Sequence, residues 1–174
     1  MRGEEKKLAE RSKKFASSER PRRAPLWKRS CPGATRDGAN VRFVVDASVA
    51  VSWCMQDEAS AIADRAFDLS RIATALVPAH WWFETRNALL VAVRRRRLEL
   101  PRLESFLRRL NLVAIQIAPI PDDRALLDIA QRHHLTFYDA AYLELAQRER
   151  IELATLDKAL VRAAVAEGVA LVGA

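Results

Sequence analysis

The chain has 174 residues, of which 50% are hydrophobic, and its formal net charge is +7. This length supports one domain with a sizeable core, and the apolar content excludes a wholly disordered chain. No apolar run reaches the roughly 18 residues of a membrane-spanning helix, so we expect no membrane association. Cys31 and Cys54 show neither metal-ligand nor disulfide spacing, which is typical of a cytoplasmic protein in a reducing environment.

The positive charge is confined to one end of the chain. Residues 1–40 contain twelve Lys/Arg against five Asp/Glu, whereas residues 41–174 contain seventeen of each. The first segment lacks apolar periodicity, and we expect a basic, disordered N-terminal extension. It is either an arm that grips phosphates or a start-site artefact, and we favour the second interpretation.

Residues 41–174 alternate between β-like and helical patterns, without internal repeats. The β-like segments are 41–46, 74–77, 112–117, 151–154 and 169–172. The helical segments are a short one from Ser48, then 58–70, 80–97, one from about Pro101, 122–134, 136–148 and 157–167. Such alternation predicts a three-layer α/β domain, with a central parallel sheet flanked by helices on both faces.

Four acidic residues lie where these strands end or these helices begin. Asp46 ends the first strand, Glu84 lies early in the helix 80–97, and Asp139 and Asp157 each open a later helix. The carboxyl ends of parallel strands form the crevice where α/β proteins bind ligands. Carboxylates gathered there repel one another unless a divalent cation compensates them, which indicates metal-dependent chemistry.

Each of these acids also has a purely structural explanation. Asp46 and Asp157 can serve as helix N-caps, and Asp139 completes a capping-box pattern. Glu84 can be a solvated residue that pairs with Arg86 or with the helix dipole. Four independent structural explanations in one α/β chain account for this placement less well than a single site shared by the four acids does.

Four short motifs occur in order within residues 41–174. They are Val44-Val45-Asp46-Ala47-Ser48-Val49, Phe83-Glu84 with Asn87-Ala88-Leu89, Tyr138-Asp139-Ala140-Ala141-Tyr142, and Thr155-Leu156-Asp157. Each motif is weak alone, but the ordered set is specific. In order and spacing the chain resembles the PIN-domain ribonucleases, especially the VapC toxins of type II toxin–antitoxin pairs.

The resemblance implies a Mg²⁺- or Mn²⁺-dependent endoribonuclease whose metal ligands are Asp46, Glu84, Asp139 and Asp157. All four acidic positions are filled, so nothing indicates an inactive enzyme. The resemblance further implies an RNA substrate, a cognate antitoxin that covers the acidic crevice, and a homodimer. Two other functions stay open at this point, namely RNA processing outside a toxin system and non-catalytic nucleic-acid binding. Toxins of this kind usually begin at the first strand, which favours the start-site interpretation of residues 1–40.

A few further residues complete the predicted site. Ser48 and Thr155 are expected as supporting hydroxyls. Of the four consecutive arginines, at most two can line one groove, and Arg94 and Arg95 are the candidates for contacts with the RNA backbone.

Some other conspicuous side chains have structural interpretations. His133 and His134 are expected at a helix C-terminus. Trp81 and Trp82 are expected in the core or at a partner interface, and Cys54 is expected to be buried.

Overall fold

The computed structural model describes residues 41–55 and 60–173. The predicted basic extension at residues 1–40 lies outside the described residues, and so does the predicted helix start at Glu58. Among the described helices, none is both long and apolar enough to cross a membrane.

The described strands form one parallel sheet with the order β3-β2-β1-β4. Their bounds are Arg42–Val45 for β1, Thr74–Val77 for β2, Ile115–Ile117 for β3 and Leu153–Ala154 for β4. In the central strand β1, Phe43, Val44 and Val45 are fully buried. This continuous apolar run is what a strand needs when both faces of its sheet are covered.

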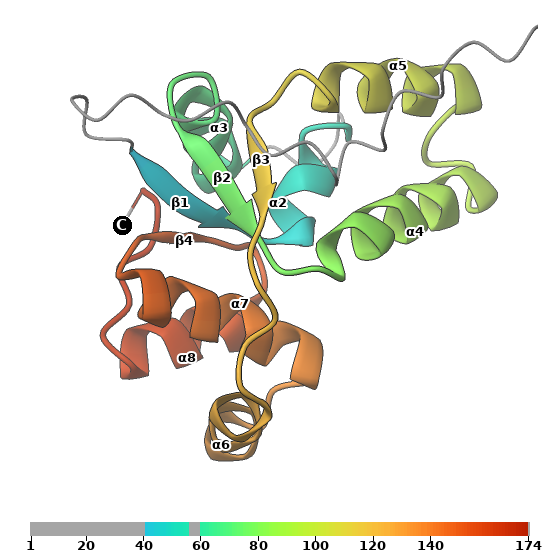
Figure 1. The fold of residues 1–174 in the computed structure, drawn as a ribbon. Coiled ribbons are helices and arrows are strands. Elements are labelled where there is room, and N and C mark those ends of the chain that lie inside the picture. Colours follow the sequence, from blue (N-terminus) through green and yellow to red (C-terminus); the bar gives the residue numbers. More distant parts are fainter. Residues whose placement is uncertain (1–40, 56–59, 174) are drawn as a thin grey trace, which may run out of the picture. The chain divides into compact units, whose positions relative to one another are not determined.

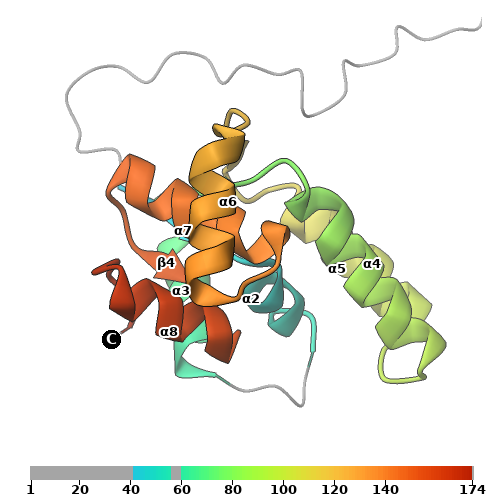
Figure 2. The same ribbon diagram turned by 90° about the horizontal axis from the view of Figure 1, so that it is seen from below.

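The helices fall into two groups that follow the path of the chain. They are α2 (Ala47–Ser52), α3 (Ala61–Leu69), α4 (Trp81–Arg94), α5 (Leu100–Leu110), α6 (Asp123–His133), α7 (Phe137–Glu149) and α8 (Lys158–Ala166). The chain runs outward from β1 through β2 to β3 and then crosses back to β4, so right-handed connections put α2–α5 and α6–α8 on opposite faces. Figure 1 shows α6, α7 and α8 grouped below the sheet, and they lie in front in the view from below in Figure 2. The predicted three-layer α/β fold is confirmed.

In the sheet, β2 and β3 lie on one side of β1, whereas β4 pairs with the other side of β1. Val44 pairs with Leu153 and Val45 with Ala154, and the Asp46 N–H donates to the Ala154 carbonyl at 2.9 Å. This reversal in strand order opens a crevice at the carboxyl ends of the two strands. Asp46 and Thr155, the residues that follow these strands, therefore emerge side by side.

Several predicted elements are shorter in the structure or absent from it. The strands predicted at 112–117 and 151–154 are confined to Ile115–Ile117 and Leu153–Ala154. The segment 169–172 is no strand and makes a single bridge, Leu153 with Leu171. It lies between Gly168 and Gly173, whose φ angles of 70° and 84° turn the chain and leave few extended residues between them. The helix predicted to reach residue 97 ends at Arg94, because Arg96 adopts a left-handed conformation with φ 57°.

The conspicuous aromatic and sulfur side chains divide between core and surface. Trp81 and Cys54 are buried as predicted, but Trp82 is 47% exposed and does not belong to the core. Its ring packs edge-on against Phe83 and carries the guanidinium of Arg86 at 4.1 Å. His133 ends α6 as predicted, and its Nε2 contacts Glu167 at 2.6 Å.

Candidate active site

Asp46 is the most buried of the predicted site acids. It follows β1, is 5% exposed and occupies the N-cap position of α2, yet its side chain makes no capping hydrogen bond. The capping explanation for Asp46 is therefore wrong. Burial raises the pKa of this carboxyl, and hydrogen bonds from Ser48 and Thr155 oppose the rise.

Two hydroxyls hold the Asp46 carboxylate. Ser48 Oγ donates to Oδ2 at 2.5 Å and Thr155 Oγ1 donates to the same oxygen at 2.7 Å. Each hydroxyl is itself fixed by a backbone donor, Leu156 N–H at 3.0 Å for Ser48 and Asp157 N–H at 3.1 Å for Thr155. Neither hydroxyl uses Oδ1, so this network orients the carboxylate and leaves its other oxygen for a ligand.

Glu84 projects from the first turns of α4 toward α7. Its Oε2 accepts a 2.6 Å hydrogen bond from the Tyr142 hydroxyl, a residue that is fully buried. Arg86 instead donates to the Trp82 carbonyl, so the alternative in which Glu84 pairs with Arg86 is not observed, although Glu84 does lie in the first turn of α4. Burial raises the pKa of Glu84, the Tyr142 hydrogen bond lowers it, and the charge of Asp139 raises it further.

Asp139 lies in the first turn of α7 and is half-buried. The Thr136 hydroxyl donates to its Oδ2 at 2.7 Å and accepts from its backbone N–H at 3.1 Å. Thr136 is thus confirmed as the N-cap of this helix, whereas Asp139 accepts from the Thr136 hydroxyl rather than from its backbone N–H as a capping box would require. This hydrogen bond does not remove Asp139 from the acidic group, because its charge acts on both Glu84 and His80.

Three of the four acids influence one another electrostatically. Glu84 raises the pKa of Asp46, and Asp139 raises the pKa of Glu84. These effects place Glu84 within electrostatic range of both Asp46 and Asp139. Asp157 contributes to none of the shifts.

Asp157 has a different environment. It is exposed, and its carboxylate accepts from the Leu160 N–H at 2.8 Å as the N-cap of α8. The capping explanation is confirmed for this residue. Its backbone N–H nevertheless joins the network around Asp46 by donating to the Thr155 hydroxyl.

The donor set suits a hard cation that keeps much of its water. In the described part of the chain, no three His, Cys, Asp or Glu side chains form a ready-made metal cage. Mg²⁺ is commonly held by one or two carboxylates together with water, and it prefers oxygen ligands. Asp46, Glu84 and Asp139 fit this mode, because their repulsion and burial would be relieved by a bound cation.

Two residues at the crevice have no role in the sequence-based prediction. Tyr142 belongs to one of the motifs and holds Glu84 in place. His80 precedes Glu84 by one helical turn, with its Nε2 3.6 Å from Glu84 Oε2. Burial lowers the pKa of His80, although Asp139 and Asp46 act in the opposite direction. The spacing of His80 and Glu84 was the signal available in the sequence.

Arg94 and Arg95 lie at the other end of α4 and are exposed. At 1.5 Å per residue, Arg94 is about 15 Å along the helix axis from Glu84. The structure therefore does not bring the two arginines into the acidic group, and they remain candidates for more distant contacts with an RNA backbone.

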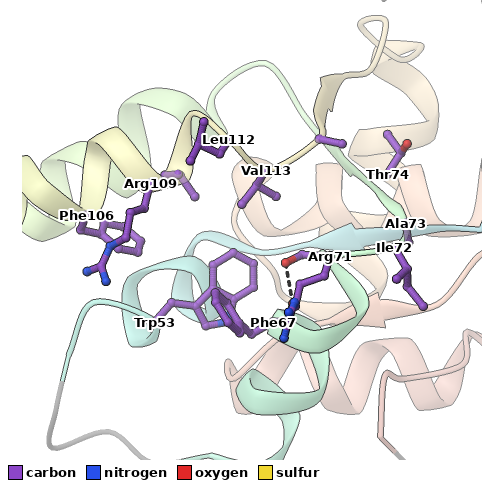
Figure 3. A pocket seen from close by; sticks show the side chains of 13 residues that line it. Trp53, Phe67, Arg71, Ile72, Ala73, Thr74, Phe106, Arg109, Leu112 and Val113 are labelled. Atoms are coloured by element: carbon purple, nitrogen blue, oxygen red, sulfur yellow. Dashed lines mark hydrogen bonds between the residues drawn. The ribbon is translucent and has the colours of Figure 1, made fainter.

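A cavity of about 530 Å³ lies away from the acids, where β2 and β3 begin. Figure 3 shows Trp53 and Phe67 side by side in it, with Phe106 and Arg109 on the facing helix α5. None of the predicted site residues lines this cavity.

Comparison with known proteins agrees with this fold. The family model described as "PIN domain" matches residues 43–166. PAE2754 from Pyrobaculum aerophilum is similar in structure, with a TM-score of 0.56, 24% sequence identity, and coverage of 71% of this chain and 86% of that chain. VapC20 from Mycobacterium tuberculosis, a sarcin-ricin-loop-cleaving toxin, has a TM-score of 0.50 and 18% identity over 70% of this chain and 94% of that chain. No curated protein sequence matches the chain. Because the family model spans well over half of its residues, the chain belongs to the PIN domain family.

Proposed function

We propose that this protein is a Mg²⁺- or Mn²⁺-dependent endoribonuclease that hydrolyses phosphodiester bonds. The observation that carries the proposal is the buried Asp46, held by two hydroxyls at the strand reversal and electrostatically coupled to Glu84. Membership of the PIN domain family supports nuclease activity in general. A binding role without metal fits less well, because carboxylates repel the phosphates of RNA.

The proposed metal ligands are Asp46, Glu84 and Asp139, with Asp157 as a fourth. A bound divalent ion makes water more acidic and neutralises the charge that develops on a phosphodiester. Oxygen donors alone favour Mg²⁺ or Mn²⁺ over softer metals.

The chain's own residues orient these ligands. Ser48 and Thr155 hold one oxygen of Asp46, and Tyr142 holds one oxygen of Glu84. These hydrogen bonds favour the ionised carboxylates and limit their rotation, so little reorganisation is needed when ion and substrate bind. Attack of water in line with the leaving 3′ oxygen would give products with 5′ phosphate and 3′ hydroxyl ends.

We further propose that the protein acts as the toxin of a toxin–antitoxin pair and forms a homodimer. The similarity of its fold to the toxin VapC20 supports the first of these two proposals, the toxin role. A small antitoxin that presents a cationic side chain to the crevice would neutralise the acids and exclude RNA.

RNA cleavage with a matched variant tests the nuclease proposal. The protein should degrade RNA in Mg²⁺ or Mn²⁺, and EDTA should stop the reaction. Asp46→Asn preserves the shape of the side chain but removes its charge, so cleavage should fall by at least a hundredfold while the folded structure persists. Full activity of this variant at matched purity would refute the assignment.

The toxin role has its own test. Induced wild-type protein should arrest the growth of a bacterial host, whereas Asp46→Asn should not.

A further inference from the structure

A second cavity, of about 220 Å³, lies next to the acidic crevice. Four segments form it, namely the turn between β2 and α4, the connection from β3 to α6, Leu126 of α6, and one face of α7. Its volume is below the roughly 300–1,000 Å³ of pockets for drug-sized ligands, so it suits a single flat ring system.

Two residues connect this cavity to the proposed site. His80 lines it and also lies 3.6 Å from Glu84. Tyr138 lines it and directly precedes Asp139, and the rings of His80 and Tyr138 are 5.1 Å apart. A group bound in the cavity would therefore belong to a nucleotide adjacent to the phosphate at the carboxylates.

The walls of the cavity suit a nucleobase. Tyr138 is 62% exposed and Phe137 is 44% exposed at its rim, while Leu126 and Leu145 are buried against it. Aromatic side chains at an RNA-binding surface stack on unpaired bases, and each such contact contributes about 1–3 kcal/mol. The exposed aromatic rings can stack on one face of a base while the buried leucines contact the other face.

Two buried polar atoms of residues that line this cavity, His80 Nε2 and Glu144 Oε2, have no hydrogen-bond partner among the described residues. Glu144 is 7% exposed and its Oε1 accepts from Arg148 Nε at 2.9 Å, but its Oε2 has no hydrogen-bond partner among the described residues. An unsatisfied buried carboxylate oxygen is costly, which makes it a strong acceptor for an incoming N–H group. Arg148 flanks the carboxylate at the rim, and its contact with the Pro119 carbonyl is long, at 3.5 Å. Arg148 also donates to Glu149 at 3.2 Å, so it stays on Oε1 of Glu144 and leaves Oε2 as the acceptor for a ligand.

We propose that this cavity binds a guanine base next to the scissile phosphate and that Glu144 reads its Watson–Crick edge. Guanine presents two adjacent donors there, N1–H and the 2-amino group, whereas adenine and cytosine place an acceptor beside their amino group. Uracil places its single N–H between two carbonyls. Only guanine thus meets a carboxylate without an opposing acceptor. The inference rests on the proposed RNA-cleaving function for its biological role, but base binding can be measured without cleavage.

Nucleotide binding in EDTA is the first test. GMP, AMP, CMP and UMP are titrated into the full-length protein, and amide chemical shifts are followed by NMR. GMP should bind on the order of tenfold more tightly than the other three, the discrimination expected of one good paired contact. IMP, which lacks the 2-amino group, should bind with intermediate affinity. Equal affinities for all these nucleotides would overturn the inference.

Three variants identify the residues responsible. Glu144→Gln places an amide donor against the donors of guanine, so the preference for GMP should disappear. Glu152→Gln is the matched control, since it makes the same change at an exposed position outside the lining of the cavity, and the preference should remain. Tyr138→Ala removes an exposed stacking surface without disturbing the core, and it should weaken the binding of GMP, AMP, CMP and UMP by similar factors. An unchanged preference in Glu144→Gln, or unchanged affinities in Tyr138→Ala, would count against the site. If Glu144→Gln does not fold, the order of nucleotide affinities in the wild type and the effect of Tyr138→Ala still test the inference.

Cleavage of a randomised RNA in Mg²⁺ separates this inference from the nuclease proposal. Product ends from the wild type should show guanine at one fixed position beside the cut, and those from Glu144→Gln should not. Cleavage without any base preference would refute the guanine site alone. A preference for GMP in a protein that cuts no RNA would refute the nuclease proposal and leave the guanine site intact.

Discussion

The Thr155 hydroxyl donates a 2.7 Å hydrogen bond to Oδ2 of Asp46, a residue 109 positions earlier in the chain. The contact follows from the parallel pairing of β1 with β4, which brings the residues after both strands together. Thr155 is 1% exposed, so both partners of this hydrogen bond are shielded from water. The hydroxyl therefore orients the acid on which the proposed chemistry depends.

Replacing Thr155 with Val tests this orienting role. The substitution keeps the branched shape but removes the donor, and it leaves Asp46 with one hydroxyl fewer. We expect metal affinity or cleavage to fall by about 10- to 100-fold, as for other residues that support metal ligands, and the free energy of unfolding to fall by about 1–2 kcal/mol. Thr155→Ser retains the hydroxyl and should keep most of the activity. Equal losses in both variants would show that packing, not the hydrogen bond, matters.

Substitutions of Asp157 separate helix capping from metal binding. Asn caps helices about as well as Asp, whereas Ala costs about 1 kcal/mol at an N-cap. Asp157→Asn should therefore preserve the unfolding free energy in urea and reduce Mg²⁺-dependent cleavage, while Asp157→Ala should reduce both. If Asp157→Asn cleaves RNA as fast as the wild type does, then the role of this side chain is to cap α8 and not to bind metal.

Tyr142→Phe tests how Glu84 is kept ionised. The Tyr142 hydroxyl bonds the charged carboxylate and so lowers the pKa of Glu84, against the larger effect of burial. Without the hydroxyl, the pKa of Glu84 should rise further, and a higher pH should be needed to ionise it. In metal-free protein, the Glu84 carboxyl resonance should titrate at higher pH in the variant than in the wild type. An unchanged midpoint would mean that the hydrogen bond does not control ionisation.

Glu167 provides a pH-dependent contribution to stability. Hydrogen bonds from His133, and then from Arg132 and Gln147, lower its pKa from 4.5 to about 2 although burial acts in the opposite direction. A folded-state pKa below the unfolded value means that this contribution is present above about pH 4.5 and is lost as the pH falls toward 2.

Glu167→Gln should therefore lower the free energy of unfolding at pH 7 by about 2 kcal/mol, a typical value for hydrogen bonds to a charged group. The difference between variant and wild type should shrink as urea unfolding is repeated at lower pH down to about pH 2, where Glu167 becomes protonated. A constant difference across this range would exclude Glu167 as the titrating group.

Local patterns in the sequence predicted most elements of this fold. Apolar runs such as Phe43–Val45 marked the buried strands, and Thr136 marked a helix start that the structure confirms as an N-cap. These features depend on neighbours within a few residues, which is why they are visible in the sequence. The failed strand at 169–172 has a similar apolar pattern, but two left-handed glycines close to it limit its pairing.

The sequence by itself determined the fold class and the acids that merit attention, because residue type and spacing carry that information. Only the tertiary structure decided how each acid is used. It showed that Asp46 is held by hydroxyls rather than capping α2, that Asp157 does cap α8, and that Tyr142 reaches Glu84 from another helix. Burial and hydrogen bonds between distant segments arise only when strands pair and helices pack on them, and these interactions determine the ionisation and orientation of a carboxylate.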